Sequence, residues 1–260
     1  MVSLTFLGTG GGRFATIYQT RSTGGIIIED KKRIHLDPGP GALTNMSHLG
    51  LDPARTDAIV ISHCHPDHYS DAEVLVEGMT CGCLNRRGYL IGSKSVIHGI
   101  ENIRPALSEY HSRLPLFTIS MVPGDEHNIA GIRIRATSTR HTDPSGIGLV
   151  FYTSAGTISY MGDTDPHPSV VEEHMGSRIL VLNVTRPFGA RLRCHLCSED
   201  VPSIIEKISP ELTVMTHMGV KMIEEGPEKQ ALQIEEITGH RVVAARDLMR
   251  LEIGKDIVVR

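Results

Sequence analysis

The sequence lacks the features that mark membrane-spanning and secreted proteins. It contains no run of about 18 apolar residues, so we expect no transmembrane helix. Residues 2–7 have no basic segment followed by an apolar core, so no signal peptide is predicted. Five cysteines, an odd number without framework spacing, favour the reducing cytoplasm. The net charge of −4 gives no general attraction to nucleic acid or anionic membranes.

The composition is that of an ordinary globular protein. Of the 260 residues, 40% are hydrophobic and 22% are charged, which is enough apolar material for a large core. No linker, composition shift or internal repeat divides the chain. The sequence therefore predicts a single domain over residues 1–260.

Strand-like and helix-like segments alternate along the chain. Two amphipathic helices are predicted, one over residues 198–208 with Ser198 as its cap, and one over residues 227–237 that ends at Gly239. Short apolar runs predict strands at residues 26–28, 33–36, 59–61, 89–91, 132–134, 149–152, 157–160, 179–182, 212–215 and 251–253. This pattern is typical of an α/β protein in which helices cover sheets.

The most informative motif is His63-Cys64-His65-Pro66-Asp67-His68, which directly follows an apolar strand segment. His63 and His65 are two residues apart, so in an extended chain they point the same way and can bind one metal ion. Asp67 and His68 follow a proline that breaks the extended path, so they can turn towards a second ion. Imidazole and carboxylate ligands suit zinc, manganese or iron, and the residue types alone do not select among them.

Three further residues that commonly bind metals lie directly after predicted strands, namely His141, Asp163 and His217. The ends of strands in one sheet lie near each other, so ligands from distant parts of the sequence can converge there. An isolated histidine or aspartate in such a place is more often a surface or turn residue. In combination with the histidine-rich motif, the three residues predict one shared metal site.

These motifs resemble the metallo-β-lactamase superfamily. The resemblance extends from Phe6-Leu7-Gly8-Thr9-Gly10 through Leu36-Asp37-Pro38-Gly39 to Ala245-Arg246-Asp247. It implies a four-layer αββα sandwich with a site for two divalent metal ions at one edge of the sheets. Zinc is the expected ion, with manganese or iron as the alternatives.

The resemblance also implies a role for each ligand position. One metal ion would be held by His63, His65 and His141, and the other by Asp67, His68 and His217, with Asp163 bridging the two. In sites of this kind, two ions activate a bridging water and stabilise an oxyanion. Asp67 would also orient that water, so it is a candidate catalytic residue.

Within this superfamily, the chain is most similar to tRNase Z-like enzymes and to the cyclic-phosphate phosphodiesterases of phosphonate breakdown. The His-Thr-Asp-Pro-Ser-Gly run at 141–146 and the His-Leu-Cys-Ser-Glu-Asp run at 195–200 carry this resemblance. In tRNase Z-like enzymes, a histidine at the place of His195 assists proton delivery to the leaving group. His195 is therefore the second candidate catalytic residue, and the alternative is a histidine that only hydrogen-bonds within its loop.

Several positions narrow the expected reaction. Asp163 stands where many β-lactamases carry a cysteine, and His65 stands where flavodiiron oxygen reductases carry a carboxylate. These choices argue against antibiotic hydrolysis and against redox iron chemistry. Asn183 replaces the acidic residue that supports the catalytic histidine of tRNase Z, and no long insertion separates His68 from Tyr89. The expected activity is therefore that of a phosphodiesterase that acts on a small or cyclic phosphodiester.

Other functions stay open from the sequence alone. They are a tRNase Z-like RNA 3′-end endonuclease, a thioester or lactone hydrolase, an iron-dependent redox protein of the same fold, and a metal-binding protein without catalysis. The last is disfavoured because all seven expected ligand positions are filled. A homodimer is a further expectation, and it rests on the resemblance alone.

Two weaker sets of residues complete the predictions. Arginine can bind two phosphate oxygens in parallel, so candidate substrate contacts are Arg13, Arg21, Arg186 and Arg191. A structural zinc site would form from Cys81, Cys83, Cys194 and Cys197 if their loops meet, with free thiols as the alternative. The glycine-rich run at 8–12 is interpreted as a turn with no helix after it, because it lacks the Gly-Lys-Ser/Thr ending of a P-loop.

Overall fold

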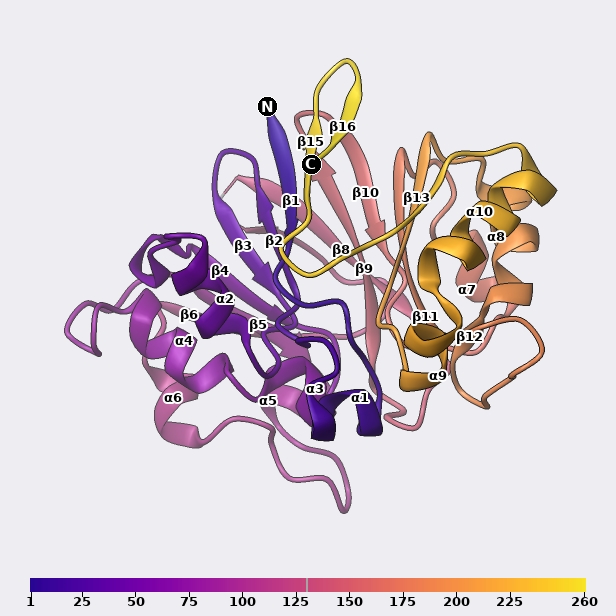
Figure 1. Ribbon diagram of the computed structural model, residues 1–260. Coiled ribbons are helices and arrows are strands. Elements are labelled where there is room, and N and C mark those ends of the chain that lie inside the picture. The colour runs from indigo at the N-terminus through magenta and orange to yellow at the C-terminus, as the bar shows by residue number, and fades with distance from the viewer. Residues whose placement is uncertain (130) are drawn as a thin grey trace.

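The computed structural model, which describes residues 1–129 and 131–260, contains two β-sheets packed face to face (Figure 1). The first sheet has the strand order β16 (Ile257–Val259), β15 (Arg250–Ile253), β1 (Val2–Phe6), β2 (Ile26–Glu29), β3 (Arg33–Leu36), β4 (Ala58–Ile61), β5 (Tyr89–Ser93) and β6 (Phe117–Met121). The second has the order β14 (Val242–Ala244), β13 (Leu212–Thr216), β11 (Ile179–Arg186), β10 (Gly156–Tyr160), β9 (Ile147–Thr153), β8 (Ile132–Ser138) and β7 (Glu126–Ile129), and β12 (Leu196–Cys197) pairs with β11.

Helices cover the outer face of each sheet. The first sheet is covered by α2 (Ala42–His48), α4 (Ala72–Met79) and α5 (Lys94–Ile97), and α6 (Glu109–Arg113) contacts α4. The second is covered by α7 (Pro168–Glu172), α8 (Val201–Ile208), α9 (Val220–Glu225) and α10 (Pro227–Thr238). Two short helices, α1 (Arg13–Tyr18) and α3 (Pro66–Tyr69), lie at the lower edge of the sandwich in Figure 1. None of the described helices is both long and apolar enough to cross a membrane. The predicted αββα architecture is confirmed.

Alternating side chains on the strands build the layers. In β2, Ile26 and Ile28 face the core between the two sheets, whereas Ile27 faces the helices. In β4, Val60 faces the central core and Ile61 the helices. Successive strand residues point to opposite faces, so a strand buried on both sides needs apolar residues at every position. This requirement explains the continuous apolar runs in the sequence.

Every predicted strand is present, and the two predicted helices are α8 and α10. Gly239 ends α10 in a left-handed conformation (φ 67°), as expected of a helix-terminating glycine. The predicted cap of α8 is wrong, because Ser198 lies in a 3₁₀ turn, η2 (Ser198–Asp200), and its hydroxyl contacts the carbonyl of Arg186. The Asp200 carboxylate instead accepts a 2.8 Å hydrogen bond from the backbone N–H of Cys197.

The topology brings the ends of several strands to one edge. The pairs β3–β4, β10–β11 and β11–β13 are parallel, so within each sheet these strands end on the same side. The segments that follow β4, β10 and β13 carry six of the seven predicted metal ligands, and His141 follows β8. They meet at the edge that α1 and α3 flank in Figure 1. Residues far apart in the sequence therefore become neighbours there.

One buried histidine between helix α7 and the second sheet makes stability depend on pH. His174 follows α7, and its Nε2 lies 3.2 Å from the hydroxyl oxygen of Thr137. Burial, aided by the nearby guanidinium of Arg135, lowers the pKa of His174 from 6.5 to about 3. The folded protein keeps this imidazole neutral, whereas the unfolded chain binds a proton below pH 6.5.

This difference is expected to lower the free energy of unfolding as the pH falls from 6.5 towards 3. A proton that binds the unfolded chain but not the folded protein changes the free energy of unfolding by about 1.4 kcal/mol per pH unit. The His174→Gln variant should therefore show a decline that is shallower by this amount between pH 6 and 4. Urea titrations at several pH values measure the decline, with His48→Gln, at an exposed position, as the control. Equal declines in wild type and H174Q would contradict the prediction.

Candidate metal centre

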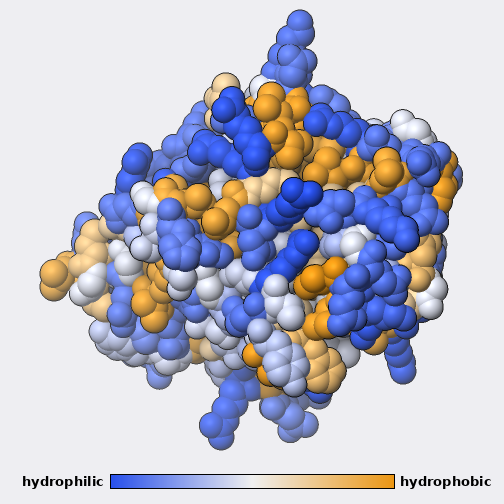
Figure 2. All heavy atoms as spheres, viewed as in Figure 1, coloured by the Kyte–Doolittle hydropathy of each residue, from blue (hydrophilic) through white to orange (hydrophobic). Residues whose placement is uncertain are grey.

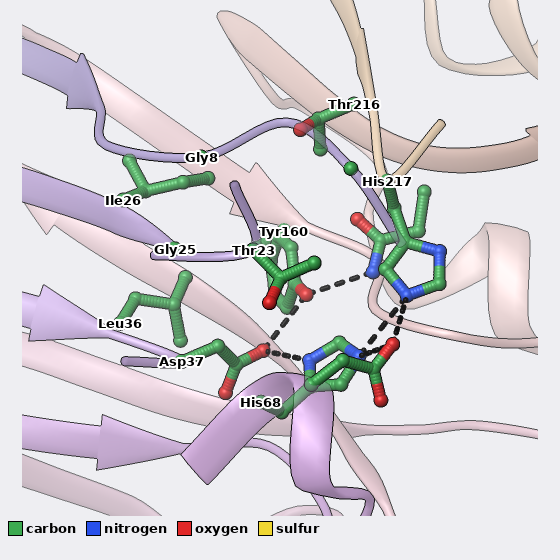
Figure 3. A pocket seen from close by; sticks show the side chains of 13 residues that line it. Gly8, Thr23, Gly25, Ile26, Leu36, Asp37, His68, Tyr160, Thr216 and His217 are labelled. Carbon is green, nitrogen blue, oxygen red and sulfur yellow. Dashed lines mark hydrogen bonds and ion pairs between the residues drawn. The ribbon is translucent and has the colours of Figure 1, made fainter. Parts of the chain in front are cut away.

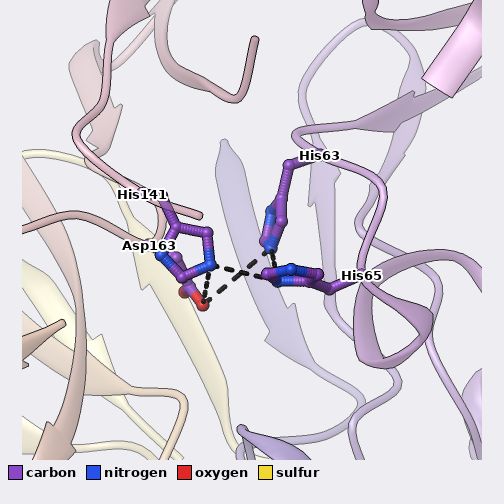
Figure 4. A group of neighbouring side chains, drawn as sticks. All are labelled: His63, His65, His141 and Asp163. Carbon is purple, nitrogen blue, oxygen red and sulfur yellow. Dashed lines mark hydrogen bonds and ion pairs between the residues drawn. The ribbon is translucent and has the colours of Figure 1, made fainter. Parts of the chain in front are cut away.

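The first group of candidate ligands comprises His63, His65, His141 and Asp163 (Figure 4). One potential ligand atom from each residue lies within 4.8 Å of those of the other three. Nε2 of His63 lies 2.9 Å from Nδ1 of His65, which in turn lies 3.0 Å from Nε2 of His141. Three ring nitrogens from two sheets therefore face one point.

The second group comprises Asp67, His68 and His217. Nε2 of His217 lies 3.1 Å from Nε2 of His68 and 3.3 Å from Oδ2 of Asp67. Pro66 is the first residue of α3, so the extended segment that carries His63 and His65 ends there. The start of this helix places Asp67 and His68 in a group with His217, next to the first group.

Asp163 lies between the two groups. Its Oδ2 is 3.7 Å from Nε2 of His141 and 4.0 Å from Nε2 of His63, which belong to the first group. The same oxygen is 3.4 Å from Nε2 of His217 and 3.8 Å from Nε2 of His68, which belong to the second. A single buried carboxylate oxygen thus faces both sets of imidazoles.

The outer ring nitrogens of these histidines have protein partners. Nδ1 of His141 lies 2.8 Å from the carbonyl oxygen of Cys194, and Nδ1 of His68 lies 2.9 Å from Oδ2 of Asp37. These oxygens can only accept, so each Nδ1 carries a hydrogen, and in His141, whose imidazole is neutral, Nε2 presents its lone pair to the group. Burial would lower the pKa of His68, but the carboxylates of Asp67, Asp37 and Asp163 raise it to about 10, so a cation bound there would have to displace a proton. Metal-binding histidines are oriented in this way, and the donor set therefore fits a divalent cation.

Asp37 is a functional residue to which the sequence alone assigns no role. Its Oδ2 accepts hydrogen bonds from Tyr160 Oη at 2.8 Å and from His68 (Figure 3). The same oxygen accepts a hydrogen bond from Ser62 Oγ at 2.7 Å. Asp37 follows β3 as the candidate ligands follow their strands, and this position is the signal that points to it. The small cavity beside Asp37 measures about 30 Å³, which suits one or two waters rather than a substrate.

The protonation states of the candidate ligands suit the binding of a cation. Burial lowers the pKa of His63 well below its usual value and also lowers those of His65 and His141, so these imidazoles stay neutral. Burial alone would raise the pKa of Asp163, but His217, His195 and His68 hold it well below its usual range. Neutral imidazoles around an ionised carboxylate are the donors that zinc, manganese and iron accept.

His195 points into the site from the loop before β12. Its Nε2 lies 3.5 Å from Oδ2 of Asp163, and its ring centre lies 4.9 Å from that of His141. Its side chain is 18% exposed, so it stands at the border between the buried groups and solvent. Burial lowers the pKa of His195, but the carboxylate of Asp163 outweighs this effect and the net shift is upward.

Asn183 contacts a different residue from the one the sequence suggests. Its amide nitrogen donates to Oδ1 of Asp163 at 2.6 Å and to the hydroxyl of Tyr160 at 2.8 Å. Nδ1 of His195 instead lies 3.2 Å from the backbone carbonyl oxygen of Arg193. The interpretation of Asn183 as a weakened partner of His195 is therefore wrong, because strand β11 directs this amide towards the central carboxylate.

The four candidate arginines differ in what they already bind. Arg191 forms an ion pair with Asp200 at 2.6 Å, and Arg21 donates to the hydroxyl of Thr9 and to the carbonyl of Ala245. These two guanidinium groups hold protein segments together. Arg13 is exposed, Arg186 is half-buried, and neither forms an ion pair within the described part of the chain. Arg13 and Arg186 are therefore the stronger candidates for phosphate contacts.

The glycine-rich segment packs directly against the second group. The backbone N–H of Gly12 donates to Oδ2 of Asp67 at 2.9 Å. A Cβ at Gly11 would lie 2.2 Å from the ring of His217, so only glycine fits there. The expectation that no helix follows this turn is wrong, because α1 begins at Arg13. A six-residue helix is too short to produce a clear apolar periodicity in the sequence.

The structure does not bring the four cysteines together. Cys81 and Cys83 follow α4 in the outer helix layer, whereas Cys194 and Cys197 flank the start of β12 on the other half of the sandwich (Figure 1). No potential metal-binding group found within residues 1–129 and 131–260 contains a cysteine, and all five cysteines are free. The structural zinc site therefore does not form, and the alternative of free thiols is confirmed. Cys194 serves the candidate metal centre through its backbone carbonyl instead.

Two proteins illustrate the sequence similarity of this chain to known proteins. Uncharacterized protein MJ1374 of Methanocaldococcus jannaschii is 43% identical over 256 residues, which cover 97% of this chain and 95% of that protein. Ribonuclease Z of Methanosarcina acetivorans is 22% identical over 307 residues, which cover 97% of this chain and 98% of that protein.

Solved structures share the architecture. The metallo-β-lactamase fold protein YhfI from Bacillus subtilis gives a TM-score of 0.79 at 16% identity, covering 96% of this chain and 98% of that one. A diphosphatase from the PhnP family gives a TM-score of 0.71 at 19% identity, covering 98% of both chains. At these identities the likeness shows the fold alone. The model of the β-lactamase superfamily domain, however, matches residues 32–218. With well over half of its residues matched, the chain belongs to the β-lactamase superfamily.

Proposed function

We propose that this chain acts as one hydrolase domain with two metal ions and cleaves a small or cyclic phosphodiester. The observation that carries the proposal is the position of Asp163, whose Oδ2 lies within 4.0 Å of imidazole nitrogens from both groups. A carboxylate in this place suits a bridge between two cations. Carboxylate and imidazole donors favour zinc, with manganese or iron as the alternatives.

The proposed ligand sets follow the two groups of side chains. His63, His65 and His141 would hold one ion, Asp67, His68 and His217 the other, and Asp163 both. When bound, two such ions lower the pKa of a shared water and stabilise the charge on phosphate oxygens. The chain's own residues then have to hold the phosphate, orient the water and protonate the leaving oxygen.

Three side chains are the candidates for these tasks. The carboxylate of Asp67 is fixed by the N–H of Gly12 and would orient the attacking water. His195 stands at the solvent border of the site, where its imidazole would donate a proton to the leaving oxygen. Arg13 directly follows Gly12 in the chain and has no ion pair in the described structure, so its guanidinium would contact phosphate oxygens.

The proposed substrate size rests on the loops around the site. The connection from α4 to β5 spans only residues 80–88, which leaves no long extension of the kind that clamps tRNA. RNA 3′-end cleavage is the second candidate, because the Ribonuclease Z of M. acetivorans aligns over nearly the whole chain.

The five free thiols support the cytoplasmic location that we also propose.

The proposal is tested by measuring metal content and activity on the same purified sample. We expect about two divalent ions per chain, with cleavage of bis(p-nitrophenyl) phosphate and of a ribose cyclic phosphate. A chelator should abolish both reactions, and zinc or manganese should restore them. Two ions without any diester cleavage, but with hydrolysis of a thioester or lactone, would overturn the phosphodiesterase assignment. Iron with a visible absorption band and no hydrolysis would point to redox chemistry.

A further inference from the structure

Helix α1 exposes an apolar face next to the candidate metal centre. Phe14 and Ile17 are each 61% exposed, and Tyr18 is 71% exposed. They occupy positions i, i+3 and i+4 of the helix, so they share one side of it. Figure 2 shows orange and tan atoms of hydrophobic side chains at the surface where Figure 1 places α1. Large apolar side chains grouped on one exposed face indicate a binding site.

The start of α1 is fixed against the metal-binding groups. The N–H of Gly11 donates to the carbonyl of Met218 at 3.1 Å, directly beside His217. The N–H of Gly12 donates to Asp67 at 2.9 Å. Phe14 is two residues from Gly12, so their Cα atoms lie at most about 7.6 Å apart. The apolar face therefore begins within one nucleotide's length of the candidate metal centre. The hydrogen bonds of Gly11 and Gly12 fix the backbone at this point.

We propose that this face binds the organic substituent of the phosphodiester, and that the substituent is a flat aromatic ring such as a nucleobase. The inference rests on the proposed function and deepens it. Phe14 and Tyr18 supply aromatic surfaces on which a base stacks, and such stacking tolerates any base because every base has a π face. Arg13 lies one helical turn from Ile17, so a phosphate and its ring can be contacted by the same helix.

The small size of the face favours a substrate group over a second copy of the chain. Aromatic side chains offer about 150–250 Å² each, so three large residues supply only several hundred square ångströms. A stable protein interface needs about 800 Å² from each partner. A single stacked ring needs far less, and it matches two aromatic side chains on one short helix.

The test compares two phosphodiesters that share the p-nitrophenolate leaving group. One is the thymidine 5′-ester and the other is the methyl ester of p-nitrophenyl phosphate. In wild type we expect kcat/KM to be about 10-fold higher for the thymidine ester, as expected for one stacked base. Phe14→Ala combined with Tyr18→Ala should remove this preference, mainly through KM, and leave the methyl ester within about twofold. Tyr110→Ala is the control, because Tyr110 is 59% exposed on α6.

A binding measurement keeps this test independent of turnover. Calorimetry should show that wild type binds thymidine 5′-phosphate about 10-fold more tightly than methyl phosphate, and that the double variant binds both equally. This result supports the inference even if neither diester is cleaved, in which case only the proposed reaction fails. Equal affinities in wild type overturn the inference. So does light scattering that shows a wild-type dimer and a monomeric double variant, because the face would then bind a second copy.

Discussion

Asp163→Ala is expected to lower phosphodiester cleavage by at least about 10³-fold and to remove most of the bound metal. The carboxylate oxygen of Asp163 faces imidazoles of both groups, so Asp163 is the side chain that the two proposed ligand sets share. Its loss leaves each ion with three ligands and removes the negative charge between them. Elemental analysis of the purified variant, together with kcat/KM for bis(p-nitrophenyl) phosphate, measures both effects.

A second variant separates this effect from misfolding. Asp163→Asn keeps the shape of the side chain and an oxygen towards Asn183, but it removes the charge. We expect it to fold as wild type does, by circular dichroism, and still to lose metal and activity. The Asp125→Asn variant, which changes a carboxylate in an exposed turn before β7, should behave as wild type. Full metal content and more than a tenth of the activity in D163A would refute the bridging role.

His195→Ala is expected to slow the cleavage of diesters with poor leaving groups by about 10²–10⁴-fold, the usual contribution of a general acid. A ribose alkoxide leaves only as it receives a proton, and the imidazole of His195 is the candidate donor at the solvent border of the site. A p-nitrophenolate leaves without protonation, so its release should slow far less. Comparing the two leaving groups in the same variant measures proton donation directly.

This comparison distinguishes a proton donor from a residue that only maintains the loop. If His195 merely positioned the loop that carries Cys194, whose carbonyl holds His141, both leaving groups would be affected equally. Metal content should stay near that of wild type in H195A, because His195 belongs to neither proposed ligand set. The His195→Gln variant serves as a shape-conserving companion. An equal loss for both substrates would rule out the general-acid role.

The fold and the seven candidate ligand positions could be predicted from the sequence for related reasons. Strands buried on both faces require continuous apolar runs, and such runs stand out in β4, β11 and β13. Metal ligands need few residue types in a restricted spacing, and the segment after β4 supplies four of them within six residues. Both signals are local in the sequence, so they can be recognised without knowledge of the tertiary structure.

The features that sequence reasoning missed depend on contacts between distant segments. Asp37 has a role only because Ser62, His68 and Tyr160 converge on it. The strands β6 and β7 carry exposed polar residues, so their sequences resemble loops. The cysteine pairs have plausible zinc spacing, but spacing within each pair does not determine whether the two loops meet.

The division of each ligand group between two sheets has a consequence for synthesis of the chain. The first group takes His63 and His65 from the segment after β4, but it takes Asp163 from the segment after β10. The second group needs His217, which follows β13. A nascent chain therefore emerges from the ribosome with its histidine-rich motif long before either group is complete. Ions would gain their full set of proposed ligands only after translation has passed His217, so metal binding would follow the synthesis of the ligand-bearing segments of both sheets.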